Sequence, residues 1–211
     1  MPISARESLN KLDREVINCK KCLDLVEAGK RPVPGKGVSK ANIMIVSTFP
    51  LINKLEDKNA SSRSYNQNEL LIKIFERTGL SLIKDTYITS LIKCAQGKPV
   101  EEKGDSPAKK TKPLKKHLNN CISYLTSEIS IITPHIIVSL GLDVSNIILE
   151  KYFSIEKKYR DIEKIHMKVF ENPSFKLVPF FDPKDVIING TVGKEKFLKD
   201  FESLSKFLKM A

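Results

Sequence analysis

Apolar residues along the chain fall into two patterns, short continuous runs and longer stretches at helical spacing. The short runs are bounded by polar or turn residues, which is typical of buried strands. The longer stretches place apolar residues three or four positions apart, which predicts helices. The predicted strands are residues 42–47, 86–90, 135–140 and 176–180, and the predicted helices are 4–17, 69–78, 114–132, 142–150 and 194–209. Strands that alternate with helices indicate a parallel α/β sheet with helices on both faces.

Proline, glycine and polar residues separate these elements. The stretch Gly29–Gly37 is rich in proline and glycine and predicts a loop. Pro134 ends the preceding helix, and Pro179 suggests the end or an exposed edge of the last strand. Residues 57–68 contain too few apolar side chains to contribute to a core.

The length and composition suit a single domain over residues 1–211, because 41% of the residues are hydrophobic. An irregular basic insertion is expected at about residues 96–116. No run approaches the roughly 20 apolar residues that span a bilayer. The first residues also lack the apolar core of a signal peptide. We therefore expect an intracellular, cytoplasmic protein that does not contact a membrane.

The cysteines are Cys19, Cys22, Cys94 and Cys121. Inside a cell, four cysteines suggest metal or redox chemistry more than structural disulfides. The two residues inside a C-x-x-C turn let both sulfurs reach one metal or cluster, and two distant thiolates can complete a four-sulfur shell. Spacing alone does not separate zinc from an iron–sulfur cluster. Disulfides, a redox pair and buried apolar cysteines are the alternatives.

The order of several weak motifs along the chain is specific when they are taken together. The motifs are Cys19-Lys20-Lys21-Cys22, residues 41–46, Glu56-Asp57, residues 87–94, Asn120-Cys121 and residues 134–141. This order resembles the thermophile-type, family 4 enzymes of the iron–sulfur branch of the uracil-DNA glycosylase superfamily. The resemblance implies a three-layer α/β/α fold with a central four-stranded parallel sheet. It also implies a [4Fe–4S] cluster on the four cysteines and DNA bound at the carboxyl edge of the sheet.

Three positions at which the resemblance implies catalytic residues carry other side chains. Thr48 replaces an acidic residue that helps to position the attacking water, and threonine cannot act as a base at neutral pH. Ser90 replaces the asparagine that reads the uracil edge, and it offers one hydroxyl in place of an amide. Asp182 replaces a histidine that donates to the developing oxyanion, and losing one such donor costs on the order of 3 kcal/mol. We therefore expect ordinary uracil excision to be lost.

Other positions of the implied base pocket are also altered. Pro50 matches the family loop, and Phe49 precedes it. Arg63 falls where the family has a phenylalanine that stacks on uracil. Tyr65 falls at a family glycine, although a small shift in alignment would let Tyr65 stack on the base instead.

Basic residues predict contacts with DNA phosphates. The net charge is +11, with 36 Lys plus Arg against 25 Asp plus Glu, and such an excess favours polyanionic partners. We expect the lysine-dense part of the insertion and the segment after the last strand to contact phosphates without reading sequence. The alternative is a solvated loop in a lysine-rich soluble protein. The predicted DNA-binding residues are Lys109, Lys110, Lys112, Lys115, Lys116, Pro183 and Lys184.

The leading hypothesis is a diverged, non-catalytic DNA-binding protein in DNA repair or replication, with a structural cluster and a protein partner in such an assembly. One alternative is an active glycosylase for uracil or another damaged base, in which Asp182 or Glu56 positions the water. A second alternative is a protein-interaction module that no longer binds DNA.

Overall fold

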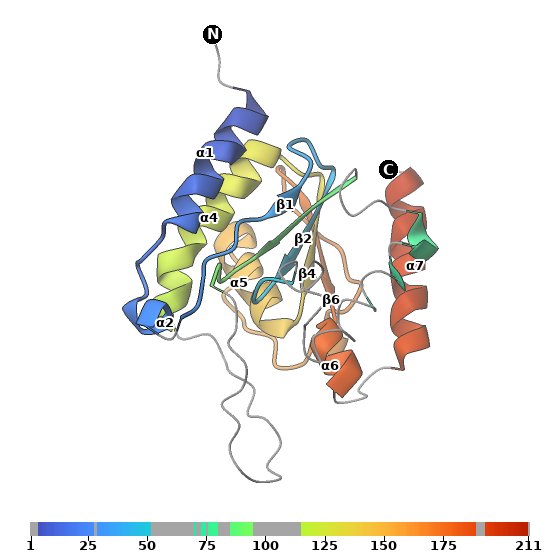
Figure 1. The fold of residues 1–211 in the computed structure, drawn as a ribbon. Helices are drawn as coiled ribbons and strands as arrows, with labels where there is room; N and C mark the ends of the chain where they lie inside the picture. Colours follow the sequence, from blue (N-terminus) through green and yellow to red (C-terminus); the bar gives the residue numbers. More distant parts are fainter. Residues whose placement is uncertain are drawn as a thin grey trace.

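A six-stranded sheet with the strand order β1-β3-β2-β4-β6-β5 organises the molecule (Figure 1). The computed structural model describes residues 4–27, 29–51, 70, 73–74, 76–79, 85–94, 115–188 and 193–210. The four central strands are parallel, and each was predicted. They are β3 (Thr86–Ser90), β2 (Ile43–Ser47), β4 (Ile136–Leu140) and β6 (Lys176–Phe180).

Two short strands flank the parallel ones and were not predicted. Strand β1 (Lys36–Gly37) pairs antiparallel with β3, and β5 (Phe170–Glu171) pairs antiparallel with β6. The prediction of a loop was therefore wrong at Lys36 and Gly37. Two residues are too few to show a hydrophobic period, so the pattern held no signal for either strand.

The longer helices lie where the pattern placed them. They are α1 (Ala5–Ile17), α4 (Lys115–Ile132), α5 (Leu142–Phe153) and α7 (Lys194–Met210). Residues 70, 73–74 and 76–78 are also helical, as expected for that segment. Three shorter elements were missed, namely α2 (Leu23–Glu27), the 3₁₀ turn η2 (Ile162–Lys164) and α6 (Pro183–Ile188). Within the described ranges, no helix is long and apolar enough to cross a membrane.

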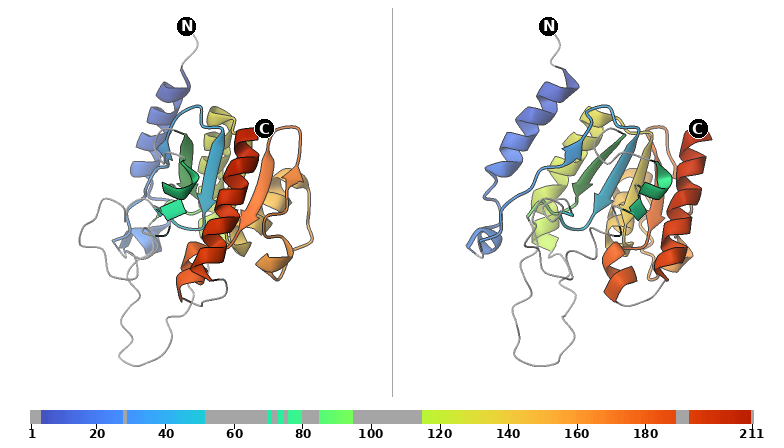
Figure 2. Two further views of the ribbon diagram at one scale, coloured as in Figure 1. Left: turned by 90° about the vertical axis from the view of Figure 1, so that its right-hand side faces the viewer. Right: turned by 45° about the vertical axis from the view of Figure 1, so that its right-hand side comes forward.

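The sheet separates two apolar cores, which confirms the three-layer α/β/α fold. Alternate residues of a strand point to opposite faces. Ile43 and Ile45 of β2 therefore pack in the core beneath α7, with Phe197 and Phe201. Met44 of β2 packs on the other face, in a core that α1, α4 and α5 supply with side chains. Figure 2 shows α7 and the helical residues 70, 73–74 and 76–78 on one side of the sheet, and α1 with α4 on the other.

Pro179 is accommodated inside β6 because its nitrogen faces the side of β5, where β6 forms few backbone hydrogen bonds. The Pro179 carbonyl accepts from the Met167 N–H at 2.9 Å, on the side away from β4. In a strand, the N–H and the C=O of one residue point to the same side. The missing N–H of Pro179 therefore removes no bond to β4, and β5 pairs only with Lys176 and Leu177.

Candidate functional site

The carboxyl ends of the parallel strands lie level with one another. Ser47 of β2 pairs with Ser90 of β3 and with Leu140 of β4, and Leu140 pairs with Phe180 of β6. The segments that follow these residues therefore emerge at one edge of the sheet, which is where ligands bind in open α/β folds. The structure brings Thr48, Ser90 and Asp182 to this edge.

The loop after β2 is fastened to the loop after β3. The N–H of Leu91 donates to the Ser47 carbonyl at 2.8 Å, and the N–H of Ile92 donates to the Thr48 carbonyl at 3.0 Å. Phe49 is half-buried and packs on the apolar group formed by Ile92 and two cysteines. Its ring therefore contacts the cysteine region, and Thr48 and Pro50 beside it are half-buried.

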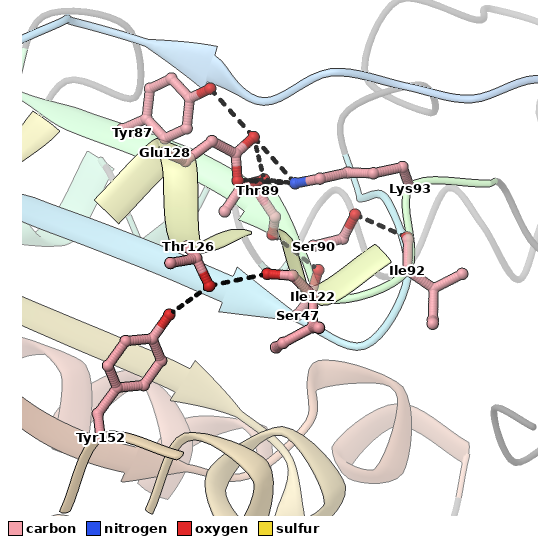
Figure 3. Close-up of polar contacts among 10 residues, drawn as sticks. All are labelled: Ser47, Tyr87, Thr89, Ser90, Ile92, Lys93, Ile122, Thr126, Glu128 and Tyr152. Atoms are coloured by element: carbon pink, nitrogen blue, oxygen red, sulfur yellow. Dashed lines mark hydrogen bonds and ion pairs between the residues drawn. The ribbon is translucent and has the colours of Figure 1, made fainter. Parts of the chain in front are cut away.

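Ser90 lies inside the protein at the end of β3. It is 2% exposed, and its hydroxyl donates to the Ile92 carbonyl at 2.8 Å (Figure 3). The single proton of this hydroxyl is thus used to shape the loop that leads to Cys94. Sequence reasoning placed Ser90 correctly, but it could not foresee this bond, because the partner depends on the path of the loop.

Asp182 caps the short helix α6. Its Oδ1 accepts from the Lys184 N–H at 2.8 Å, and its carbonyl accepts from the N–H groups of Asp185 and Val186. Gly141 lies against it with φ of +102°, and a Cβ on this glycine would come within 3.3 Å of the Asp182 Cβ. Pro183 is buried, while Lys184 is half-buried. The two residues therefore present little surface at this edge.

All four cysteines are free thiols, and α4 is the element that contacts most of them. Cys121 lies on α4, and the Asn120 amide donates to the Cys22 Sγ at 3.4 Å. The Tyr124 hydroxyl, one turn further along α4, hydrogen-bonds the Cys19 side chain. Cys94 and Cys121 share one buried apolar group with Ile92. The cysteines that spacing grouped together therefore lie in one region.

The environment of Cys94 and Cys121 disfavours their thiolate forms. Burial, followed by the charges of the other three cysteines, raises the pKa of Cys94 to about 12. Burial also raises the pKa of Cys121, and a hydrogen bond from the Lys93 backbone opposes that rise. In the described part of the chain, no three histidine, cysteine or acidic side chains are arranged to hold a single metal ion. The ligand set thus stays a prediction.

An acidic clamp joins the C-x-x-C segment to the start of α4. Asp24 of α2 accepts from the Lys116 Nζ and from the His117 Nε2, each at 2.9 Å. Lys116, and then His117, lower the pKa of Asp24 to about 2. Lys116 is therefore already paired with a carboxylate, and both Lys116 and Lys115 beside it are exposed.

Several predicted site residues lie outside the described residues. They are Glu56, Arg63, Tyr65, Lys109, Lys110 and Lys112.

A buried ion pair lies behind the cysteines, and sequence reasoning missed it. The Lys93 Nζ is 2.7 Å from the Glu128 Oε2, and both side chains are 1% exposed. Tyr87 and Thr89 of β3 complete the network (Figure 3). A signal existed, because Glu128 is a single acid on the apolar face of the predicted helix, three residues after Leu125 and four before Ile132. A carboxylate at such a position requires a buried partner.

A family model described as the uracil DNA glycosylase superfamily matches residues 34–204. The chain therefore belongs to this superfamily, whose α/β fold agrees with the sheet and its two helical layers.

Within the superfamily, the chain is similar to three archaeal proteins named type-4 uracil-DNA glycosylase. It is 31% identical to that of Sulfurisphaera tokodaii over 89% of this chain and 80% of the relative. It is 30% identical to that of Saccharolobus solfataricus over 94% of this chain and 88% of the relative. It is 26% identical to that of Archaeoglobus fulgidus over 95% of this chain and 93% of the relative. These similarities extend over most of the chain and confirm the resemblance noted from the motifs.

Proposed function

We propose that this chain is a DNA-binding member of the superfamily that holds a [4Fe–4S] cluster and no longer excises uracil. It serves DNA repair or replication as a component of a larger assembly. The DNA-facing region is the carboxyl edge of the sheet, where Thr48, Ser90 and Asp182 lie.

The burial of Ser90 and its hydrogen bond to Ile92 are the main support for the proposed loss of uracil excision. A uracil glycosylase must grip the edge of a flipped base with hydrogen-bonding groups that face the pocket. Ser90 is 2% exposed, and its proton is donated to the Ile92 carbonyl. This side chain therefore cannot replace an amide that both donates and accepts. Thr48, in the neighbouring loop, adds no negative charge to orient a water.

Asp182 supports the same conclusion through its charge. Excision of uracil leaves negative charge on the base, and a donor at that position stabilises it. Asp182 is an acid, and its Oδ1 is engaged with the Lys184 N–H at the start of α6. An ionised carboxylate here opposes the developing charge, so the electrostatic contribution has the wrong sign for this reaction.

The four cysteines are the candidate ligands of the cluster. In a [4Fe–4S] cluster each thiolate binds a different iron, so the sulfurs surround a volume and do not converge on one point. The four thiols are neighbours, because Cys94 and Cys121 share one buried group and the charges of Cys19 and Cys22 act on Cys94. The bonds from Asn120 and from the Lys93 backbone are those that stabilise bound thiolates. Cys19, Cys22, Cys94 and Cys121 would hold the cluster.

The cluster, when bound, supplies a cross-link and no chemical step. The chain itself brings three separate segments to this place, namely the C-x-x-C turn, the loop after β3 and helix α4. The Asp24 clamp and the Tyr124 hydroxyl hold the first of these against α4. The loop after β3 in turn fastens the Thr48 loop through two backbone bonds.

The cluster is tested by anaerobic purification followed by iron and sulfide analysis. We expect about four irons and four sulfides per chain, with visible absorbance that Cys94→Ser and Cys121→Ser each reduce. Colourless, iron-free protein that folds equally well with these serines contradicts the assignment.

The function is tested with single- and double-stranded oligonucleotides that contain uracil, hypoxanthine or xanthine. We expect a mobility shift at low salt and no abasic product, with an active type-4 relative as the positive control. Release of any base contradicts the inactive assignment and favours a glycosylase, which is the function that the names of the relatives suggest. Absence of any shift favours a protein-interaction module.

A further inference from the structure

The buried ion pair connects two cysteine-bearing elements. Lys93 immediately precedes Cys94 in the loop after β3, while Glu128 lies on α4 about two turns after Cys121. The Lys93 Nζ lies 2.9 Å from the Glu128 Oε1 and 2.7 Å from the Glu128 Oε2 (Figure 3). The pair therefore spans the gap between Cys94 and Cys121, which are separated by 26 residues in sequence.

Strand β3 anchors this pair on the sheet side. The Thr89 hydroxyl accepts from the Lys93 Nζ at 2.6 Å and lies 2.9 Å and 3.0 Å from the two Glu128 oxygens. The Tyr87 hydroxyl donates to the Glu128 Oε1 at 3.3 Å. Each charge therefore has several partners in fixed directions, so the network sets a distance and an orientation between the loop and α4.

Stability alone does not account for such a pair. Replacing a buried ion pair with apolar residues of similar volume is often neutral or stabilising, because desolvation offsets the Coulomb attraction. An apolar pair, however, fixes neither direction nor spacing as these hydrogen bonds do. The Lys93 backbone also contacts the same region twice, through a bond to Cys121 and through its carbonyl, which accepts from the Val33 N–H at 2.8 Å.

We propose that Lys93 and Glu128 are positioning residues that hold Cys94 at the spacing from Cys121 that the cluster needs. This proposal rests on the proposed function, because the cluster is part of it. The two residues touch neither DNA nor a reacting base in this scheme. Their role is to fix the loop that carries Cys94 to the helix that carries Cys121.

The experiment compares single and double variants of the full chain. Lys93→Met and Glu128→Gln each leave one buried group without its partner, and the double variant Lys93→Met/Glu128→Leu removes both charges. Arg77→Met is the matched control, because it breaks the ion pair between Arg77 and Glu195. This pair is exposed and joins the helical segment that carries Arg77 to α7.

Three measurements separate positioning from stability. The first is the melting temperature. The second is the rate at which anaerobically purified protein releases iron to a ferrous chelator, well below that temperature. The third is the rate at which iodoacetamide alkylates Cys94 in iron-free protein, followed by mass spectrometry. Cys94 is 6% exposed, so slow alkylation reports that it is held in place.

We expect the double variant to melt near the wild-type temperature, yet to release iron at least tenfold faster and to alkylate Cys94 several-fold faster. Arg77→Met should match the wild type in both rates.

Wild-type rates of iron release and alkylation in the double variant would overturn the proposal, because the ion pair would then have no part in positioning Cys94. If a single variant does not fold, the double variant still decides, since it buries no unpaired charge. If wild-type protein contains no iron, the proposed cluster fails, while the alkylation rates still decide whether the pair positions Cys94.

Discussion

Two aspartates, Asp13 of α1 and Asp24 of α2, have pKa values shifted in opposite directions. Burial, reinforced by Glu128 and opposed by Lys93, raises the pKa of Asp13 to about 6. Lys116 and His117 lower the pKa of Asp24 to about 2. An unfolded aspartate titrates near 4. Ionisation of Asp13 at neutral pH therefore opposes folding, whereas ionisation of Asp24 favours it.

Asp13→Asn should stabilise the protein at pH 7.5. Because the folded pKa of Asp13 is raised, its contribution is most favourable below about pH 4 and is lost as the pH rises through about 6. The full shift corresponds to about 3 kcal/mol, but Asp13 is half exposed, so we expect a gain of about 1 kcal/mol. Urea unfolding at several pH values measures the difference, which should shrink towards zero near pH 4.

Glu15→Gln is the control for this prediction. Glu15 is exposed on the same helix, and its replacement removes the same charge. It should change the free energy of unfolding by less than about 0.5 kcal/mol at every pH. A gain for Asp13→Asn that does not depend on pH would show that titration of Asp13 is not its cause.

Single residues were predictable where chemistry alone identifies them. The spacing of the cysteines grouped Cys94 with Cys121, and the structure places both in one buried group. The partner of Ser90 was not predictable, because a hydroxyl bonds whichever carbonyl the local loop presents. The ion pair of Lys93 and Glu128 was not predictable as a pair, since the two residues lie 35 positions apart in sequence.

At the scale of elements, α7 closes one face of the sheet through aromatic contacts. Phe201 is 4% exposed, and its ring centroid lies 4.3 Å from that of Phe180 in β6 and 5.3 Å from that of Phe197. Phe201→Ala should lower the free energy of unfolding by about 3–5 kcal/mol, since it leaves a cavity between helix and sheet. Chemical denaturation measures the loss. Lys199→Ala on the exposed side of the same helix should change it by less than about 0.5 kcal/mol.

Elements were predictable in proportion to their length. The five-residue strands are buried or nearly so at every position, so an apolar run identified β2, β4 and β6, and β-branched and aromatic residues identified β3. Helix α6 has six residues, too few for a clear period, although its start carries an Asp182-Pro183 signal. That dipeptide was interpreted only as a site motif. The structure shows that it also begins a helix.

At the scale of the whole molecule, the net charge of +11 predicts salt-dependent binding to DNA. Neutralising Lys109, Lys110 and Lys112 to glutamine should lower the slope of log K against log salt by about 2 to 3. Lys116→Gln should change it by less than about 1, because Asp24 already pairs with Lys116. Fluorescence anisotropy with a labelled duplex between about 50 and 200 mM salt measures the slope, because about six to ten phosphate contacts change the affinity by about 10³- to 10⁵-fold over this range.

The control for the lysines carries the same loss of charge on helix α7. Lys194, Lys199 and Lys206 are exposed on α7, away from the C-x-x-C segment (Figure 2). Their replacement with glutamine should leave most of the slope intact. Equal effects of the two triple variants would show that the overall charge governs binding and that the insertion has no special part in it.

Restoring the three family side chains tests whether they account for the loss of excision. Thr48→Glu supplies the acid, Ser90→Asn the amide and Asp182→His the oxyanion donor. The combined variant should release uracil from single-stranded DNA, while each single change should not, because groups that act in one step are strongly non-additive. Asp182→His removes the hydrogen-bond acceptor of the Lys184 N–H, which costs about 1 kcal/mol, so the melting temperature of the variant must be checked before activity is compared.

A folded triple variant that remains inactive would show that the loss of excision has its cause elsewhere in the site. Uracil release by the unmodified chain would contradict the proposed loss of excision and would show that these three side chains permit it.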